Sequence, residues 1–267
     1  MRIALGIEYD GSSYHGWQAQ SNAHKQLPTV QAALQQALSR IADHPVELYC
    51  AGRTDAGVHA TGQVVHFDTE AKRHPDAWIW GANAYLPPDI AVRWAKSVDY
   101  GFHARFSALA RRYRYLIYNH PIRPAVLSGS VTWNYYPLEA EAMQAATSYF
   151  LGEQDFSSFR SSECSSKTAM RKVTSLQVTR ENDFVVIEVE ANAFLHHMVR
   201  NIAGVLMRIG AGWEKPAWAL EVLQARDRRK AAETAPAQGL YLVQVRYPEL
   251  YSFPYSDAVS KKITRLI

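Results

Sequence analysis

Cysteine is scarce in this chain, which has only Cys50 and Cys164 among its 267 residues. Two cysteines so far apart, with no Cys-x-x-Cys pair, argue against a disulfide framework and against a cysteine-rich zinc site. Also missing is any run of the ~18 apolar residues that a bilayer-spanning helix needs. Glu8 interrupts the N-terminus too early for a signal peptide. We therefore expect a cytoplasmic protein without a membrane contact.

Common catalytic signatures are missing as well. The sequence has no His-Glu-x-x-His, no His-x-Glu with a Cys-x-x-Cys partner, no phosphate-binding glycine loop with a lysine, and no Gly-x-Ser-x-Gly elbow. The adjacent His196 and His197 are predicted to lie on a helix, where they would point to different sides and could not share one ion. We therefore expect no metal site.

The net charge of +4 is only mildly basic, but the basic residues are clustered. They are interleaved with aromatic residues over 102–115, and a second cluster lies in the serine-rich stretch 160–172. Such patterns are typical of surfaces that contact a phosphate backbone and exposed bases. A third cluster, 226–230, is better explained as a solvated helix end. The dense aromatic residues argue against that explanation for 102–115.

Apolar periodicity predicts one order of elements twice along the chain. In the first half, strands are expected at 2–9, 46–50, 63–68 and 90–97, with helices after Thr29 and Pro75. In the second half, strands are expected at 113–118, 173–179, 184–190 and 240–247, with helices at 138–151 and 194–209 and a further helix from Pro216. A hairpin turn is expected at 181–183 and a loop at 152–171.

This order predicts an α+β fold of two tandem ferredoxin-like or RRM-like βαββαβ halves, 1–100 and 101–247, followed by a tail at 248–267. The halves would form a mixed, mainly antiparallel sheet with helices on one side and a central active-site cleft. No strand carries the aromatic signature of an RRM, which argues against a tandem RNA-binding module and leaves an enzyme as the better interpretation.

The most distinctive stretch is 52–59, Gly-Arg-Thr-Asp-Ala-Gly-Val-His, between two apolar segments. Asp55 could be a reactive carboxylate on a rigid turn, or an aspartate that merely caps the turn. A lone arginine on an apolar helix, Arg200, could pair with an acid or simply face solvent. The loop 14–18 could contact a ligand, or its tryptophan could pack over the sheet edge.

Three segments together, 52–59, 111–115 and 194–201, closely resemble the tRNA pseudouridine synthase A family in order and spacing, and the resemblance extends over about 1–247. It implies isomerisation of uridine at positions 38, 39 and 40 of the tRNA anticodon stem-loop, without a cofactor or metal. Carried over to this sequence, Asp55 would be the nucleophile. Tyr113 would contact the target base, Arg200 would pair with Asp55, and Arg53 would enter the space that the flipped base leaves.

The resemblance also implies a homodimer in which each tRNA bridges both subunits. It implies tRNA contacts from two segments: Phe102, His103, Ala104, Arg105 and Phe106, and Glu163, Cys164, Ser165, Ser166 and Lys167. Whether Asp55 attacks C1′ or removes a sugar proton on a glycal route stays open at this point. The alternative function is a non-catalytic tRNA-binding or chaperone protein on the same fold.

Overall fold

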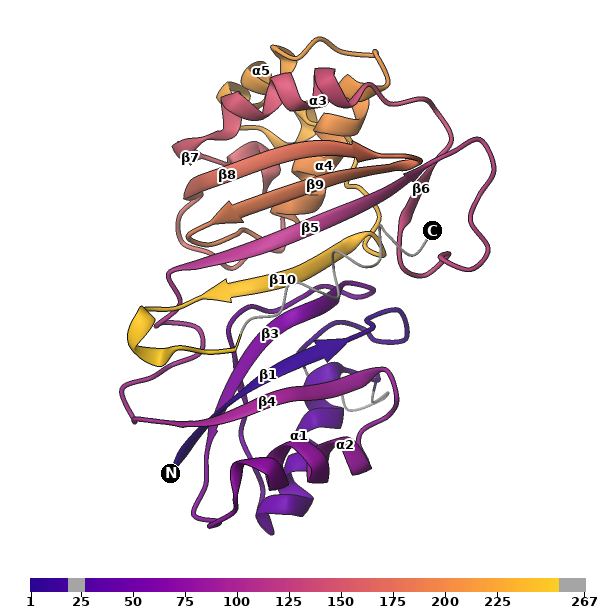
Figure 1. Ribbon diagram of the computed structural model, residues 1–267. Helices are drawn as coiled ribbons and strands as arrows, with labels where there is room; N and C mark the ends of the chain where they lie inside the picture. Colours follow the sequence, from indigo (N-terminus) through magenta and orange to yellow (C-terminus); the bar gives the residue numbers. More distant parts are fainter. Residues whose placement is uncertain (19–26, 255–267) are drawn as a thin grey trace. The chain divides into compact units, whose positions relative to one another are not determined.

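The computed structural model describes residues 1–18 and 27–254, which form the predicted α+β fold with mainly antiparallel strands (Figure 1). The chain divides into two compact units. The first contains 1–109 and the described residues from Tyr241 onward, and the second contains 110–240. The halves predicted from element order, 1–100 and 101–247, stay a prediction. Part of the predicted tail, 255–267, lies outside the described residues. Within the described ranges, no helix has the length and apolar character needed to cross a membrane.

The first unit is built on a sheet with the strand order β4-β1-β3-β10. β1 (Arg2–Tyr9) runs antiparallel to both β3 (His59–Asp68) and β4 (Ile90–Val98). The short β2 (Tyr49–Cys50) adds to β3 in antiparallel fashion, and β10 (Leu240–Arg246) pairs with β3 in parallel. The last strand in the described part of the chain therefore adds to the sheet of the first unit.

Two helices pack against each other in this unit, α1 (Val30–Ala42) and α2 (Ala82–Tyr85) (Figure 1). The Thr29 side chain accepts a hydrogen bond from the Ala32 N–H at 3.4 Å, which confirms the predicted N-cap. The buried side chains of α1 recur at helical spacing: Val30, Leu34, Ala37, Leu38 and Ala42. A π-helical segment, Ala77–Gly81, runs directly into α2.

The second unit has its own antiparallel sheet in the order β5-β9-β8-β7. Its strands are β5 (Ala110–Asn119), β9 (Phe184–Ala191), β8 (Met170–Glu181) and β7 (Gly152–Asp155). A short β6 (Thr132–Asn134) pairs in parallel with β5. The sequence does not reveal β6 and β7, because strands of three or four residues carry no readable periodicity.

Helices α3 (Ala140–Thr147), α4 (Met198–Gly210) and α5 (Trp218–Ala225) gather beside β7, β8 and β9 in Figure 1. The predicted helix over 194–209 begins four residues late, at Met198. His197 takes the left-handed φ of 64°, which a right-handed helix excludes, so the chain turns before α4 starts.

Candidate functional site

The predicted site residues are divided between the two units. Arg53 and Asp55 belong to the first unit, and Tyr113 and Arg200 belong to the second. Each pair is positioned by the strands and loops of its own unit.

Asp55 lies on the tight turn between β2 and β3. The Val58 N–H donates to the Asp55 carbonyl oxygen at 3.2 Å, and Gly57 takes a φ of 75°, which glycine adopts without the penalty of a Cβ. Thr54 is buried, Asp55 is half-buried and Arg53 is exposed. The turn therefore presents a carboxylate partly shielded from water beside an exposed guanidinium.

The loop after β1 packs against this turn and holds its backbone. The Trp17 N–H donates to the Thr54 carbonyl oxygen at 3.0 Å, and the Gly57 N–H donates to the Tyr14 carbonyl oxygen at 3.3 Å. Gly16 approaches so closely that a Cβ there would lie 2.7 Å from the Thr54 carbonyl oxygen. Trp17 is only 1% exposed, which supports the packing interpretation of this loop over ligand contact.

Gln63 is completely buried on β3 and binds both backbone groups of Gly52. Its Nε2 donates to the Gly52 carbonyl oxygen at 2.6 Å, while its Oε1 accepts from the N–H groups of Gly52 at 3.4 Å and Val64 at 3.2 Å. These contacts fix where the turn that carries Asp55 begins. Gln63 was not among the predicted site residues, although a glutamine inside an apolar strand is the kind of signal that marks a buried polar contact.

Cys50 lies next to the turn but is unsuited to act as a nucleophile. Removal of its thiol from water raises the pKa of Cys50 to about 11, a shift that the positive charges of Arg53 and Arg105 only partly oppose. The thiol is therefore protonated at neutral pH.

The segment 102–106 divides into buried and exposed side chains. Phe102 and Ala104 have no exposed surface, neither side chain nor backbone, so neither residue is accessible to a substrate in this structure. His103 and Arg105 both contact the ring of Phe106, which is 75% exposed. Three of the five predicted residues therefore form one accessible group of an aromatic ring, an imidazole and a guanidinium.

Tyr113 lies in the middle of β5, opposite Val189 on β9. It is 8% exposed, and its ring makes an edge-to-face contact with Phe194 at a centroid distance of 4.9 Å. On the same face of the strand, burial raises the pKa of Tyr115, whose hydroxyl lies 2.6 Å from the Thr132 hydroxyl. Tyr113 is thus held by its strand and by the turn before α4.

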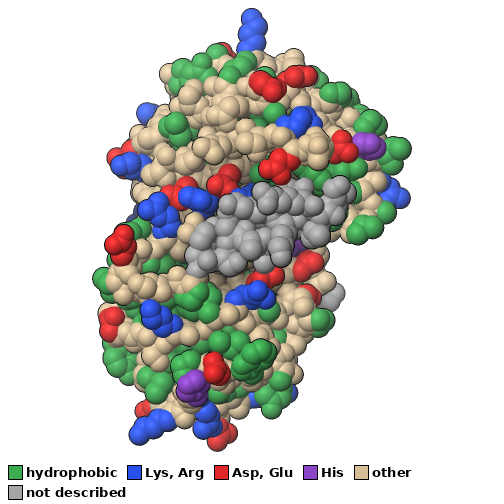
Figure 2. Space-filling view, in the orientation of Figure 1, with side chains coloured by type: hydrophobic (Ala, Val, Ile, Leu, Met, Phe, Trp, Pro, Cys, Tyr) green, Lys and Arg blue, Asp and Glu red, His purple; other side chains and the backbone are tan. Residues whose placement is uncertain are grey.

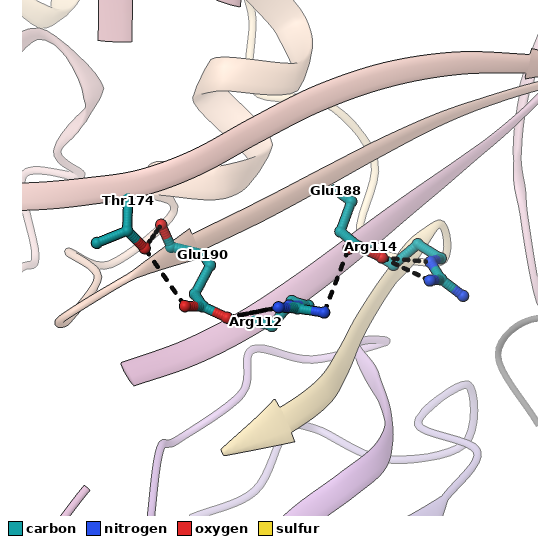
Figure 3. Close-up of polar contacts among 5 residues, drawn as sticks. All are labelled: Arg112, Arg114, Thr174, Glu188 and Glu190. Carbon is teal, nitrogen blue, oxygen red and sulfur yellow. Dashed lines mark hydrogen bonds and ion pairs between the residues drawn. The ribbon is translucent and has the colours of Figure 1, made fainter. Parts of the chain in front are cut away.

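The arginines on either side of Tyr113 point to the opposite face of β5, where Figure 3 shows a row of polar contacts. Arg112 donates to Glu190 through Nε at 3.1 Å and Nη2 at 2.9 Å, and Thr174 donates to the same carboxylate at 3.4 Å. Arg114 pairs with Glu188 in the same way. Glu190 is only 4% exposed, and a charge so far removed from water requires a partner. Part of the basic cluster over 102–115 is therefore neutralised inside the sheet.

Arg200 lies in the first turn of α4 and is half-buried. Its Nε donates to the Ala235 carbonyl oxygen at 2.8 Å, and the Ala235 N–H donates back to the Arg200 carbonyl oxygen at 3.2 Å. This reciprocal pair holds the guanidinium against the segment that follows α5. Arg200 is therefore more than a solvated arginine on a helix surface.

The prediction that His196 and His197 point to different sides of a helix, and therefore could not share one ion, is wrong. Both precede α4, and their ring centroids lie 4.0 Å apart. The cause is the left-handed backbone of His197, which folds the two rings onto one side of the turn.

The predicted contact segment 163–167 is tied to this turn. The Cys164 sulfur accepts a hydrogen bond from the His196 N–H at 3.4 Å, and the Cys164 carbonyl oxygen accepts one from Arg160 at 2.7 Å. Cys164 is buried and Ser166 is half-buried, whereas Glu163, Ser165 and Lys167 are exposed. Alternate residues of the segment therefore face solvent.

On the face shown in Figure 2, basic and acidic side chains are interspersed over the described surface, with no continuous basic field on this side. The local groups of exposed basic and aromatic residues described above are therefore more informative than the overall charge of +4.

Comparisons with known proteins extend over most of the chain. Residues 6–107 and 146–248 match the family model described as tRNA pseudouridine synthase. The chain is 58% identical over 254 residues to tRNA pseudouridine synthase A of Photorhabdus laumondii, with 95% of each chain covered. The protein of the same name from Coxiella burnetii is 56% identical over 253 residues, again with 95% of each chain covered.

Among solved structures, a chain in the crystal structure of a Cbf5-Nop10-Gar1 complex is 12% identical, with a TM-score of 0.33. The similarity covers 76% of this chain and 54% of that chain. At this level it supports no inference.

Proposed function

Because the chain belongs to the tRNA pseudouridine synthase family, we propose that it modifies uridines 38, 39 and 40 of the tRNA anticodon stem-loop, with Asp55 as the nucleophile. The enzyme is an isomerase that converts uridine to pseudouridine in tRNA. The proposed positions and the proposed role of Asp55 are supported by the resemblance of 52–59 and by the geometry of the turn.

The reaction changes one bond to the sugar and exchanges one proton. The N1–C1′ bond breaks, the uracil rotates within the site, and C5 bonds to C1′. C5 then loses its hydrogen to solvent, and N1 gains a proton. A stacked uridine hides C1′ and C5, so it must first be extruded, at a cost of a few kcal/mol. A single carboxylate can serve such a reaction as nucleophile or base.

We assign the remaining predicted roles as follows. Tyr113 contacts the target base, and Arg53 enters the space that the extruded base leaves. The exposure of Arg53 supports its role, because a guanidinium can stack on bases and bind phosphate. Arg200 is the proposed partner of the Asp55 carboxylate.

The observation that carries the proposal is the rigid support of the Asp55 turn. Gln63, Trp17 and Tyr14 bind its backbone at three points, and all three contacts come from the first unit. A reacting group must be held within about 0.5 Å of its productive position, which support of this kind provides. An aspartate that only caps a turn does not need to be held so precisely.

Replacing Gln63 with methionine is expected to reduce kcat about tenfold, because a displacement of less than 1 Å at a reacting group has effects of this order. The half-buried Gly52 N–H and carbonyl groups would lose their partner, which costs about 1 kcal/mol of unfolding free energy. Steady-state kinetics and denaturant unfolding of the same preparation measure the two effects.

Gln35→Met is the matched control. The Gln35 side chain, on α1 of the same unit, donates to the Val46 carbonyl oxygen at 3.0 Å. We expect it to lower stability without lowering kcat. An equal loss of kcat in both variants would show that Gln63 contributes to stability alone.

We further propose that the tRNA contacts the exposed group of His103, Arg105 and Phe106 and the exposed residues of 163–167. The homodimer and the cytoplasmic location stay predictions from the resemblance and the composition. The non-catalytic alternative, a tRNA-binding or chaperone protein, retains these surfaces but needs no clamped carboxylate.

The positions are tested by mapping pseudouridine in tRNA transcripts that carry uridine at only one of positions 38, 39 and 40 and cytidine at the other two. Each transcript should be modified at its single uridine, and a transcript with cytidine at all three should stay unmodified. Modification elsewhere in the last transcript would refute the assigned positions. Binding of all four transcripts without modification of any would favour the non-catalytic alternative.

A further inference from the structure

We propose that Arg228 is a positioning residue that holds the guanidinium of Arg200 in place through the segment 232–235. The inference rests on the proposed function, because it assumes that Arg200 takes part in the reaction. Arg228 comes from the basic cluster 226–230, which the sequence alone explains as a solvated helix end.

Arg228 differs from its neighbours in this cluster. The side chain of Arg229 is 88% exposed and contacts Asp227 at 2.8 Å, and Arg226 lies 3.5 Å from Asp155 at the surface. Arg228 is half-buried instead, and its guanidinium points into the second unit. The interpretation as a solvated helix end therefore holds for its neighbours and is wrong for Arg228.

The guanidinium of Arg228 binds three acceptors. Nη1 donates to the Ala232 carbonyl oxygen at 2.8 Å, and Nη2 donates to Asn201 Oδ1 at 3.0 Å and to the Thr234 hydroxyl at 2.9 Å. The Thr234 hydroxyl in turn donates to Asn201 Oδ1 at 2.7 Å. The Arg228 side chain thus connects both ends of the segment 232–234 to Asn201 on α4.

Asn201 is a suitable anchor for these contacts. It has no exposed surface, and its Nδ2 donates to the Phe159 carbonyl oxygen at 2.8 Å. This bond fixes the amide so that Oδ1 faces both donors. Asn201 directly follows Arg200 on α4, so the anchored segment lies beside the arginine that it supports.

The same segment contacts Arg200 directly. Ala235 exchanges two hydrogen bonds with Arg200, one of them from the guanidinium Nε. The fit is close, because a Cβ on Gly204, one turn further along α4, would lie 2.1 Å from the Glu233 carbonyl oxygen. If the segment moved away from α4, the Ala235 carbonyl would no longer orient the guanidinium.

The test compares Arg228→Met with Arg229→Met, which removes the same charge one residue away. Single-turnover pseudouridine formation with excess enzyme should fall about 10- to 100-fold in the Arg228 variant and stay near wild type in the Arg229 variant. The dissociation constant for tRNA should change alike in both. Equal rates in the two variants, or a rate loss explained entirely by weaker binding, would overturn the inference.

A second pair of variants keeps the test decisive if Arg228→Met folds poorly. Thr234→Ser retains the hydroxyl and should keep the wild-type rate. Thr234→Val has the same shape without the hydroxyl and should lose rate, about tenfold, with the folded fraction checked by thermal melting. Equal rates for the serine and valine variants would contradict the proposal.

If Arg228 acts through Arg200, its effect on the rate must depend on the presence of Arg200. In an Arg200→Met background, adding Arg228→Met should cost no further rate, because the group that it positions is gone. Additive losses would show that Arg228 acts independently of Arg200 and would overturn the inference. This outcome is separate from the proposed function, which fails if Asp55→Asn retains turnover, if the positions of modification differ, or if the wild-type protein binds tRNA without modifying it.

Discussion

Asp55→Asn is expected to reduce pseudouridine formation by about 10⁴-fold or more, because the amide has nearly the shape of the carboxylate but can act neither as nucleophile nor as base. The backbone contacts that hold the turn involve Thr54, Gly57 and Gly52 and are unaffected by the change. The free energy of unfolding should therefore change by less than about 1 kcal/mol. Tritium release from tRNA labelled at C5 of uridine measures the turnover.

Asp68→Asn is the matched control. Asp68 is in the same unit, pairs with Arg2 at 2.8 Å, and its side chain is 53% exposed, so its removal tests the loss of one negative charge at the surface. We expect turnover close to wild type. Wild-type-like tritium release by Asp55→Asn would refute the nucleophile role, and loss of release together with loss of tRNA binding would point to a role in binding.

Arg200→Met is expected to reduce turnover about 100- to 1000-fold, the usual effect of removing one aligned charged donor from an active site. Its stability cost should be about 1–2 kcal/mol, because methionine fills similar space but loses the bond from Nε to the Ala235 carbonyl. Arg200→Lys keeps the charge but lacks the planar fork, so it should recover only part of the rate. Single-turnover kinetics and thermal unfolding provide the comparison.

Arg208→Met is the control on the same helix. Arg208 lies in the last turn of α4, pairs with Glu214 at 3.4 Å, and its side chain is 45% exposed. Its loss should leave turnover near wild type. If Arg200→Met lost activity only in proportion to its loss of stability, Arg200 would be a structural residue, and the proposed pairing with Asp55 would fall.

Local sequence patterns predicted those elements whose cause is local. The helix after Thr29 forms as expected, because both its cap and its apolar spacing are contained in one stretch of chain. The hairpin at 181–183 is confirmed too, with Asn182 at a φ of 52°, a conformation that asparagine tolerates. Such features require no knowledge of distant partners.

Elements that depend on distant partners were missed or misplaced. β6 and β7 exist because β5 and β8 offer edges to pair with, which no short window of sequence reveals. The start of α4 was placed four residues early, because the apolar run from Phe194 gives no sign of the left-handed backbone at His197.

In the candidate site, too, some features followed from the sequence and others depended on contacts between distant residues. The three segments 52–59, 111–115 and 194–201 together indicated the family, and through it the reaction class and the role of the lone acid, because that resemblance depends on which residues are present and in what order. Only the tertiary structure showed that Gln63 clamps the Asp55 turn and that Arg112 is neutralised by Glu190, while Arg228 binds Asn201. These contacts join residues up to 78 positions apart. Their existence depends on strand register and on helix packing, which set whether a polar side chain faces water or a partner.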